Sequence, residues 1–269
     1  MLVCDDSRCI GCGQCARACY SGYLRFEEGR VILPEGSCLD CGHCLAVCPR
    51  EALTLTGYAV GQVEAYDPAR MSVETEKLLG AIRFKRSMRH FSKEAVTREQ
   101  LEQILTAARY SPTVGNFQTM RFAVLQTQKM AVVRQAAKVL YEAKQKDHPE
   151  TALFKMDTLR MIYEASLRDE DRLFHGAPAV IVVMDKPLSA EPGANAYIAA
   201  SRMELVAQSM GLGSCYVGLF IRAGRIQPEL FRPLGLTEDL EPCLALAVGH
   251  PALRYLRTVP RRPLSVQWL

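Results

Sequence analysis

The clearest alternation of apolar and polar positions lies in "TREQLEQILTAARYSP", residues 97–112. Thr97 is suited to cap a helix, and Gln100 completes a capping box three residues later. The apolar positions then recur at helical spacing: Leu101, Ile104, Leu105 and Ala108. Pro112 ends the pattern. This segment is therefore predicted to be an amphipathic helix with one buried face.

Other segments of the chain give weaker but readable patterns. Helices are expected over 72–91, over most of 128–174 with a break at Pro149, and over 195–213, where apolar residues lie all round and Gly211 ends the run. Short apolar runs predict strands at 121–127, 178–185 and 242–251. Near the N-terminus, residues 23–35 predict a hairpin turning at Glu28-Gly29, and 51–57 a further strand.

Composition limits the functional classes. The chain has 269 residues, 49% of them hydrophobic and 23% charged, and a net charge of +4, which is too weak to indicate nucleic acid binding. Residues 1–56 contain 5 Arg/Lys and 7 Asp/Glu, whereas the remaining residues contain 28 Arg/Lys and 22 Asp/Glu. The excess of positive charge in the larger part of the chain favours an anionic ligand there. With no signal peptide and no apolar run of about 18 residues, we expect a cytoplasmic protein that does not enter a membrane.

Eight of the eleven cysteines fall in "CIGCGQCARACY" (9–20) and "CLDCGHCLAVCP" (38–49). A disulfide framework is disfavoured in a reducing compartment, and structural zinc usually takes two separated pairs of ligands. The repeated spacing CxxCxxCxxxC is instead that of bacterial ferredoxins with cubane clusters, in which the fourth cysteine of each run binds the other cluster.

This spacing predicts two 4Fe–4S clusters. The first takes Cys9, Cys12, Cys15 and Cys48, and the second takes Cys38, Cys41, Cys44 and Cys19. Glycines in both runs allow tight turns and direct N–H groups toward sulfur. Tyr20 stands where the second run has Pro49, so hydrogen bonding near Cys19 is expected to differ. His43 is interpreted as a neighbour of the second cluster rather than a ligand.

These patterns divide the chain into three parts. Residues 1–57 are predicted to form a two-cluster ferredoxin module, 58–74 a linker, and 75–269 a larger domain that mixes helices and strands. The overall fold class is therefore α+β.

Four segments of the larger domain carry candidate chemistry: "KRSMRHF" (85–91), "SPTVGNFQTMRF" (111–122), "GLGSCYVG" (211–218) and "RYLRTVPRRPL" (254–264). Each alone has an ordinary structural explanation, as a solvated basic face, a turn or a helix end. In this order they resemble the nitroreductase-like flavoproteins over residues 75–265, and with the cysteine runs the chain resembles the ferredoxin-fused branch of that family. The resemblance implies a three-layer α/β/α flavin domain and a homodimer with FMN at its interface.

The resemblance also implies the FMN contacts. Lys85, Arg86, Ser87 and Arg89 correspond to the segment that holds the phosphate and ribityl chain, for which arginine forks and a lysine charge are suited. Asn116, with Thr113 and Gln118 on the same loop, corresponds to contacts at the flavin edge. The turn of Gly211, Gly213 and Ser214 corresponds to the backbone near the reactive ring, where a Cβ would obstruct. Arg257 and Arg261 correspond to C-terminal phosphate donors.

Three positions depart from the family pattern. Lys85 replaces an arginine, Thr119 and Met120 replace the Pro-Trp that follows Gln118 in the family, and the C-terminal basic pair is offset. The family's usual reliance on cofactor chemistry leaves the catalytic residues unknown. Tyr110, Tyr216 and His175 are candidate proton donors, with packing as the alternative, and 140–175 is a candidate pocket-shaping segment.

The favoured function is an oxidoreductase that passes electrons from a ferredoxin or flavodoxin through two 4Fe–4S clusters to FMN and on to a small nitro- or ene-type acceptor. One alternative is an NAD(P)H-dependent nitroreductase or ene-reductase, because the family binds nicotinamide without a Rossmann motif. A second alternative is a non-enzymatic electron carrier or redox sensor.

Overall fold

The computed structural model describes residues 2–36, 38–58, 63–127, 129–188 and 193–269. Met1 and Ser37 of the predicted module, residues 59–62 of the predicted linker and Gln128 at the start of the predicted helical region lie outside the described residues. The chain forms two compact units, one of Met1–Ser72 with Gly115–Phe117, and one of Val73–Val114 with Gln118–Leu269.

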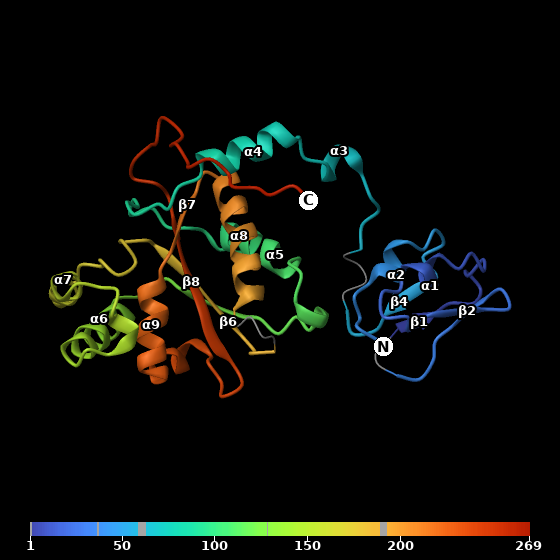
Figure 1. Cartoon of the computed structure of the whole chain (residues 1–269), viewed down its shortest axis with the longest axis horizontal. Helices are drawn as coiled ribbons and strands as arrows, with labels where there is room; N and C mark the ends of the chain where they lie inside the picture. The colour runs from blue at the N-terminus through green and yellow to red at the C-terminus, as the bar shows by residue number, and fades with distance from the viewer. Residues whose placement is uncertain (1, 37, 59–62, 128, 189–192) are drawn as a thin grey trace. The chain divides into compact units, whose positions relative to one another are not determined.

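The first unit contains two small antiparallel sheets and short helices (Figure 1). Strand β1 (Leu2–Cys4) pairs with β4 (Leu53–Leu55), and β2 (Arg25–Glu27) pairs with β3 (Arg30–Ile32). Helices α1 (Gln14–Ala18), α2 (His43–Ala46) and α3 (Pro68–Met71) complete it. The predicted hairpin is confirmed, and its turn residues Glu28 and Gly29 have φ of 46° and 78°.

Glycine starts both short helices of the first unit. Gly13 and Gly42 precede α1 and α2 with φ of 66° and 75°, a conformation that costs other residues free energy. The predicted tight turns within the cysteine runs are therefore confirmed. The core between the sheets and helices is small, and cysteine sulfur forms part of it together with Leu2, Leu24, Leu53 and Leu55.

The second unit is built on an antiparallel sheet with strand order β5–β6–β8–β7 among the described residues. Its strands are β5 (Arg121–Leu125), β6 (Ala179–Asp185), β7 (Gly213–Tyr216) and β8 (Glu241–Gly249). Every residue of β6 is buried, and its side chains alternate between two separate cores. This period of two shows that both faces of the sheet are covered.

Helices cover the two faces. One core contains residues of α6 (Lys129–Gln145), α7 (Met156–Leu167) and α9 (Gly218–Ile226), and the other contains residues of α5 (Arg98–Arg109) and α8 (Ala194–Ser209). In Figure 1 strands β6 and β8 run between α9 and α8. The predicted three-layer α/β/α arrangement is confirmed, as is the capping box of Thr97 and Gln100 at α5.

The expected helix over 72–91 is shorter than predicted, since α4 spans Thr75–Phe84. The chain then becomes extended because it adds to the sheet edge: Ser87 forms a parallel bridge with Ser214, and Met88 N–H donates to Ser214 O at 2.9 Å. The expected turn after α8 is present at Gly211, but it is followed directly by the strand β7, which the sequence did not predict. The pattern also did not predict α9 or the 3₁₀ segment η4 (Pro228–Leu234).

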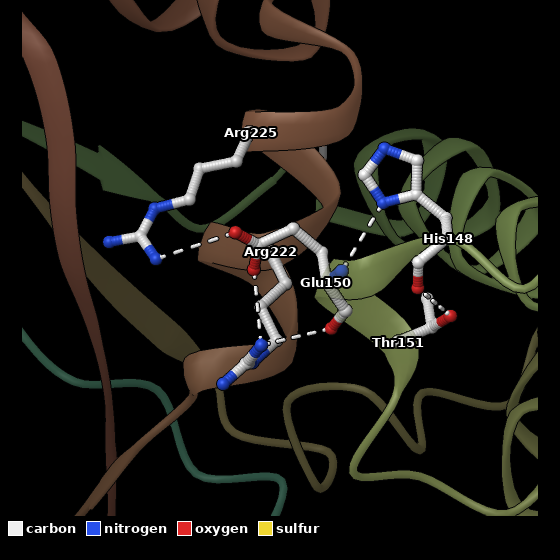
Figure 2. Close-up of polar contacts among 5 residues, drawn as sticks. All are labelled: His148, Glu150, Thr151, Arg222 and Arg225. Atoms are coloured by element: carbon white, nitrogen blue, oxygen red, sulfur yellow. Dashed lines mark hydrogen bonds and ion pairs between the residues drawn. The ribbon is translucent and has the colours of Figure 1, made fainter.

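The connection between α6 and α7 contains the 3₁₀ segment η3 (Pro149–Thr151) and is fastened to α9 by Glu150. Figure 2 shows its carboxylate between two arginines of α9, at 3.1 Å from Arg222 Nη1 and 3.8 Å from Arg225 Nη1. Arg222 Nη1 also donates to Glu150 O at 2.9 Å. Residues 140–175 thus pack into the helical layer. No helix in the described parts of the chain is both long and apolar enough to span a bilayer.

Candidate functional site

The cysteines of the two runs line two separate cavities in the first unit. The first cavity is lined by Cys9, Cys12, Cys15 and Cys48, together with Cys4. The second is lined by Cys19, Cys38, Cys41 and Cys44. The grouping places three thiols of one run with the fourth of the other, in the same two sets that the spacing predicts. The eleven cysteines, all within the described residues, are free thiols.

Backbone amides point at three of the sulfur atoms. Leu24 N–H donates to Cys19 Sγ at 3.3 Å, Asp40 N–H to Cys38 Sγ at 3.4 Å, and Ala52 N–H to Cys48 Sγ at 3.3 Å. Such bonds stabilise thiolate ligands and tune cluster potentials. The donors lie outside the glycines that the sequence suggested for this role. No three His, Cys, Asp or Glu side chains in the described ranges converge on a point that could hold a single metal ion.

The environment of Cys19 differs from that of Cys4 and Cys44. Burial raises the pKa of Cys44 to about 11 and that of Cys4 to about 11. At Cys19 burial also acts to raise the pKa, but hydrogen bonds from Leu24 N–H and from Ser21 bring it below the ordinary thiol value. The backbone around Cys19 therefore favours the anionic sulfur that a cluster ligand needs, although Tyr20 replaces the proline found after Cys48.

Two side chains approach sulfur atoms of the second cavity. His43 Nδ1 lies 3.3 Å from Cys41 Sγ, and Ser21 Oγ lies 3.6 Å from Cys19 Sγ. The structure thus places His43 beside a predicted ligand, in keeping with its interpretation as a neighbour. With sulfur bound to iron, His43 can only donate to it.

A cleft in the second unit, together with a hollow that adjoins it, brings together most of the predicted FMN contacts. Its volume is about 490 Å³, within the ~300–1,000 Å³ typical of small-molecule sites. Lys85, Arg86, Gly211, Gly213 and Ser214 line it. An adjoining hollow shares Lys85 and Arg86 and is also lined by Ser87, Arg89 and Arg261. Segments more than a hundred residues apart therefore meet at the β7 edge of the sheet.

The cleft contains polar atoms that lack a partner within the described chain. Arg86 Nη1 donates to Arg83 O at 3.0 Å and to Lys85 O at 2.5 Å, whereas its buried Nε and Nη2 have no acceptor there. Gln208 donates from Nε2 to Ala81 O at 2.9 Å, and its buried Oε1 has no donor. Buried groups of this kind are costly unless a ligand satisfies them. An anion with a hydrogen-bonding ring, such as FMN, fits this donor and acceptor set.

Lys85 is held by the protein itself. Its Nζ forms an ion pair with Glu204 on α8 and lies 5.6 Å from the ring centroid of Tyr216 on β7. Burial and the nearby Glu204 carboxylate raise the pKa of Tyr216 far above the ordinary phenol value. The charge of Lys85 is therefore largely compensated, and the arginines provide the uncompensated positive charge at the cleft.

The two glycines of the predicted turn have different structural roles. Gly211 has φ of 76° and ends α8 in a Schellman arrangement, with its N–H donating to Gln208 O at 2.9 Å and Leu212 N–H to Ala207 O at 2.9 Å. A Cβ on Gly213 would lie 2.7 Å from Met88 Cβ. Each glycine is thus required by the protein's own backbone and packing.

The loop that follows α5 does not contribute to the lining of the cleft among the described residues. Gln118 N–H donates to Thr113 Oγ1 at 3.1 Å. Asn116 belongs to the first compact unit, where its Nδ2 donates to Leu39 O at 3.1 Å and to Asp40 O at 3.0 Å. Arg257 is exposed and likewise absent from that lining. The FMN roles of these four residues remain predictions, as do those of the residues that line the cleft.

Thr119, which stands in place of the family's proline, is fixed by a buried carboxylate. Its Oγ1 donates to Asp185 Oδ1 at 2.6 Å, and Asn195 Nδ2 donates to Asp185 Oδ2 at 2.8 Å. Asn195 Oδ1 in turn accepts from Val114 N–H at 3.1 Å. Side-chain hydrogen bonds thus hold the loop where a proline ring would restrict it.

Sequence reasoning missed several residues of the cleft. Glu204 and Gln208 face it from α8, and Met88, Arg254 and Tyr255 also line it. Helix α8 is apolar nearly all round, so the pattern gave no sign of which polar residues face a ligand. His175 lies outside the cleft lining in the described structure; burial, then Arg89, lowers its pKa.

The second unit has a sheet covered by helices on both sides and a basic cleft at one sheet edge, and the first unit is rich in cysteine. Residues 82–250 match the model of the nitroreductase family, and residues 8–52 match that of the 4Fe-4S dicluster domain. The chain belongs to the nitroreductase family, with an N-terminal 4Fe–4S dicluster domain, and is therefore an oxidoreductase.

Curated relatives carry the provisional name NADH dehydrogenase/NAD(P)H nitroreductase. One from Archaeoglobus fulgidus is 25% identical over 65% of this chain and 86% of its own length, and one from Methanothermobacter thermautotrophicus is 26% identical over 65% and 78%. A nitroreductase with bound FMN from Bacteroides fragilis superimposes with a TM-score of 0.58, 22% identity, and coverage of 72% of this chain and 100% of its own. A second nitroreductase with bound FMN, from Desulfitobacterium hafniense, superimposes with a TM-score of 0.55 and 23% identity. The match covers 72% of this chain and 100% of that one. These structures share the fold.

Proposed function

We propose that the protein is an FMN- and iron–sulfur-dependent oxidoreductase that takes electrons from a ferredoxin or flavodoxin and reduces a small nitro- or ene-type acceptor. When bound, the clusters carry single electrons and FMN exchanges one or two, so together they can join a one-electron donor to a two-electron acceptor. The observation that carries the proposal is the unsatisfied guanidinium of Arg86 in the cleft, combined with the two thiol-lined cavities.

The arginines of the cleft have the chemistry to bind FMN. Arg86, Arg89 and Arg261 meet at the adjoining hollow and can supply paired N–H donors to a phosphate dianion. Lys85, paired with Glu204, has the role of orienting this segment more than of neutralising the phosphate. Gln208 Oε1 is available to accept from an N–H of the ligand. Solved structures of the same fold contain FMN, which supports the assignment.

The cysteines of the first unit have the chemistry to hold two 4Fe–4S clusters, one in each cavity. Each cavity has four thiols from both runs, and the amides of Leu24, Asp40 and Ala52 can stabilise bound thiolates. The same reduced thiols favour a cytoplasmic location. Membership of the nitroreductase family favours an enzyme over a non-enzymatic carrier or sensor.

The C-terminal segment supports a homodimer. Residues 254–269 contain no helix or strand, and large apolar side chains are highly exposed there, including Leu264 and Trp268. A second copy of the chain would cover them, as the resemblance to dimeric flavoproteins implies. A variant that ends at Arg262 is expected to lose dimerisation in light scattering and to retain less FMN. A truncated chain that remains dimeric would contradict this role.

The competing function is direct reduction by NAD(P)H, which the names of the curated relatives favour. Anaerobic stopped-flow reduction of the full-length protein distinguishes the donors. Reduced ferredoxin or flavodoxin should bleach the flavin at least tenfold faster than NADH or NADPH, and faster reduction by a nicotinamide would reverse the order. The preparation should contain about eight iron atoms and one FMN per chain. Iron and sulfide without FMN would overturn the enzyme proposal.

A matched pair of variants tests the route. Cys44→Ala removes a ligand of the second cavity, and Cys243→Ala changes a buried thiol of the other unit that lines neither cavity among the described residues. Cys44→Ala should retain FMN and lose reduction by ferredoxin, and Cys243→Ala should retain both. Full ferredoxin activity in Cys44→Ala would exclude the clusters from the route.

A further inference from the structure

The first cavity contains one thiol more than a cubane cluster requires. Cys4 lines it beside Cys9, Cys12, Cys15 and Cys48. Strand β1 fixes its position, since Cys4 pairs with Leu53 of β4 in the antiparallel register. Burial, and then the neighbouring Cys9, raise the pKa of the Cys4 thiol to about 11. A fifth cysteine, placed on a paired strand, therefore lines the cavity together with the four predicted ligands.

The internal repeat supplies a comparison within the same protein. The two runs are offset by 29 residues, so Cys9 corresponds to Cys38, and Cys4 corresponds to Leu33. Leu33 packs against the small core, and it is not among the described residues that line the second cavity. The second cavity thus has four thiols where the first has five.

We propose that Cys4 is a reserve ligand for the first 4Fe–4S cluster, able to replace Cys9. The inference rests on the proposed function, because it assumes that this cluster is present. In the exchange the Fe–Sγ bond to Cys9 breaks and an Fe–Sγ bond to Cys4 forms. The released Cys9 thiolate takes up the proton that the Cys4 thiol loses. The iron keeps its oxidation state, and charge, protons and electrons balance.

Three features support this role over simple packing. Cluster iron requires thiolate sulfur, and Cys4 is the one further cysteine of the first unit in the described chain. Cys4 lines the same cavity as Cys9, the ligand that it would replace. The remaining ligands, Cys12, Cys15 and Cys48, come from other segments, so the exchange leaves three bonds in place.

The test uses the full-length protein purified anaerobically, with iron, sulfide and FMN analysis and EPR of the oxidised and reduced states. Cys9→Ala should retain about eight iron atoms and two reduced 4Fe–4S signals. Its counterpart Cys38→Ala should lose the second 4Fe–4S signal. Cys4→Ala should keep the iron content and the two 4Fe–4S signals of wild type. Cys4→Ala combined with Cys9→Ala should lose the first signal or give the oxidised three-iron signal. FMN content reports folding of the other unit in every variant.

The outcomes separate the inference from the proposed function. Wild-type protein with a single cluster or none would contradict the proposed function. Two clusters in wild type with a three-iron or empty first site in Cys9→Ala would overturn the reserve-ligand role alone. If Cys9→Ala does not fold, the proposal is tested by the rate at which wild type and the Cys4 variants release iron to a chelator. Cys4→Ala and Cys4→Ser should then release first-cluster iron several-fold faster than wild type, and equal rates would overturn the proposal.

Discussion

Gly213 lies directly against Met88, so closely that a Cβ on the glycine would be 2.7 Å from both Cβ and Cγ of the methionine. A contact below 3 Å cannot be accommodated without movement, and Met88 is 4% exposed. Met88 N–H also donates to Ser214 O at 2.9 Å. The close approach of β7 to the segment that carries Arg86 and Arg89 therefore depends on the missing side chain at position 213.

Gly213→Ala is expected to destabilise the second unit by about 1–3 kcal/mol, the usual cost of overpacking, and to reduce the FMN retained on purification. Urea unfolding and flavin absorbance measure the two effects. Gly218→Ala is the matched control, because a Cβ there meets no atom within 4 Å. Wild-type stability and FMN content in Gly213→Ala would show that the segment can shift freely.

Arg86 provides the most direct test of the FMN site, because its Nε and Nη2 are buried without an acceptor. Arg86→Ala should weaken FMN binding about 10- to 100-fold, since hydrogen bonds to a charged group contribute ~1.5–3 kcal/mol. Arg86→Lys keeps the positive charge but loses the paired N–H donors of the guanidinium, so its FMN affinity should lie between those of wild type and Arg86→Ala. Fluorescence titration of apoprotein with FMN gives the constants.

Two controls define the meaning of the Arg86 result. Arg83→Ala changes a neighbouring exposed arginine whose carbonyl, not its side chain, contacts Arg86. It should bind FMN like wild type. Iron content should stay unchanged in all three variants, because the cysteines lie in the other unit. Equal FMN affinity in Arg86→Ala and Arg83→Ala would contradict a phosphate-binding role.

The sequence predicted those helices and strands whose apolar pattern and end residues lie within one short segment. Helix α5 has a capping box and one apolar face, and β6 is a short run of buried apolar residues. The grouping of the cysteines followed from spacing alone. The extension of the chain after α4 did not, because it depends on pairing between Ser87 and Ser214, which are 127 positions apart. No local periodicity encodes that contact.

The same limit applies to the cleft. The basic segment at 85–89 was predicted to contact FMN from the family resemblance, but the pairing of Lys85 with Glu204 depends on the rotation of α8. Because α8 is apolar nearly all round, its sequence does not fix which face meets the cleft. Gln208 was missed for the same reason, although its amide is buried and half satisfied.

Glu150 is expected to stabilise the connection between α6 and α7 (Figure 2). Its side chain is 26% exposed and lies between Arg222 and Arg225. Glu150→Gln should therefore lower the free energy of unfolding by about 1 kcal/mol, a value kept small because solvent screens a partly exposed ion pair. Glu229→Gln is the control, because its pair with Arg232 is more exposed and 3.8 Å long. Equal urea midpoints for the two variants would contradict the prediction.

His43 lies 3.3 Å from Cys41 Sγ and should tune the potential of the second cluster. A hydrogen bond donated to a ligand sulfur stabilises the more negative, reduced state, so its loss lowers the midpoint potential. A bond worth ~1 kcal/mol corresponds to about 40 mV for one electron, which sets the expected upper size of the shift in His43→Ala. The first cluster, whose cavity lacks His43 among its described lining residues, should keep its potential.

EPR-monitored redox titration measures both potentials in one sample, and the Cys44→Ala variant identifies which signal belongs to the second cavity. Ser21→Ala gives a comparison on the same cluster, because Ser21 Oγ is farther from its sulfur, at 3.6 Å from Cys19, and should produce a smaller shift in the same direction. An unchanged second potential in His43→Ala would show that the ring does not donate to Cys41. A shift of both potentials together would indicate a general change in the fold of the unit, because His43 contacts a sulfur of the second cavity alone among the contacts described.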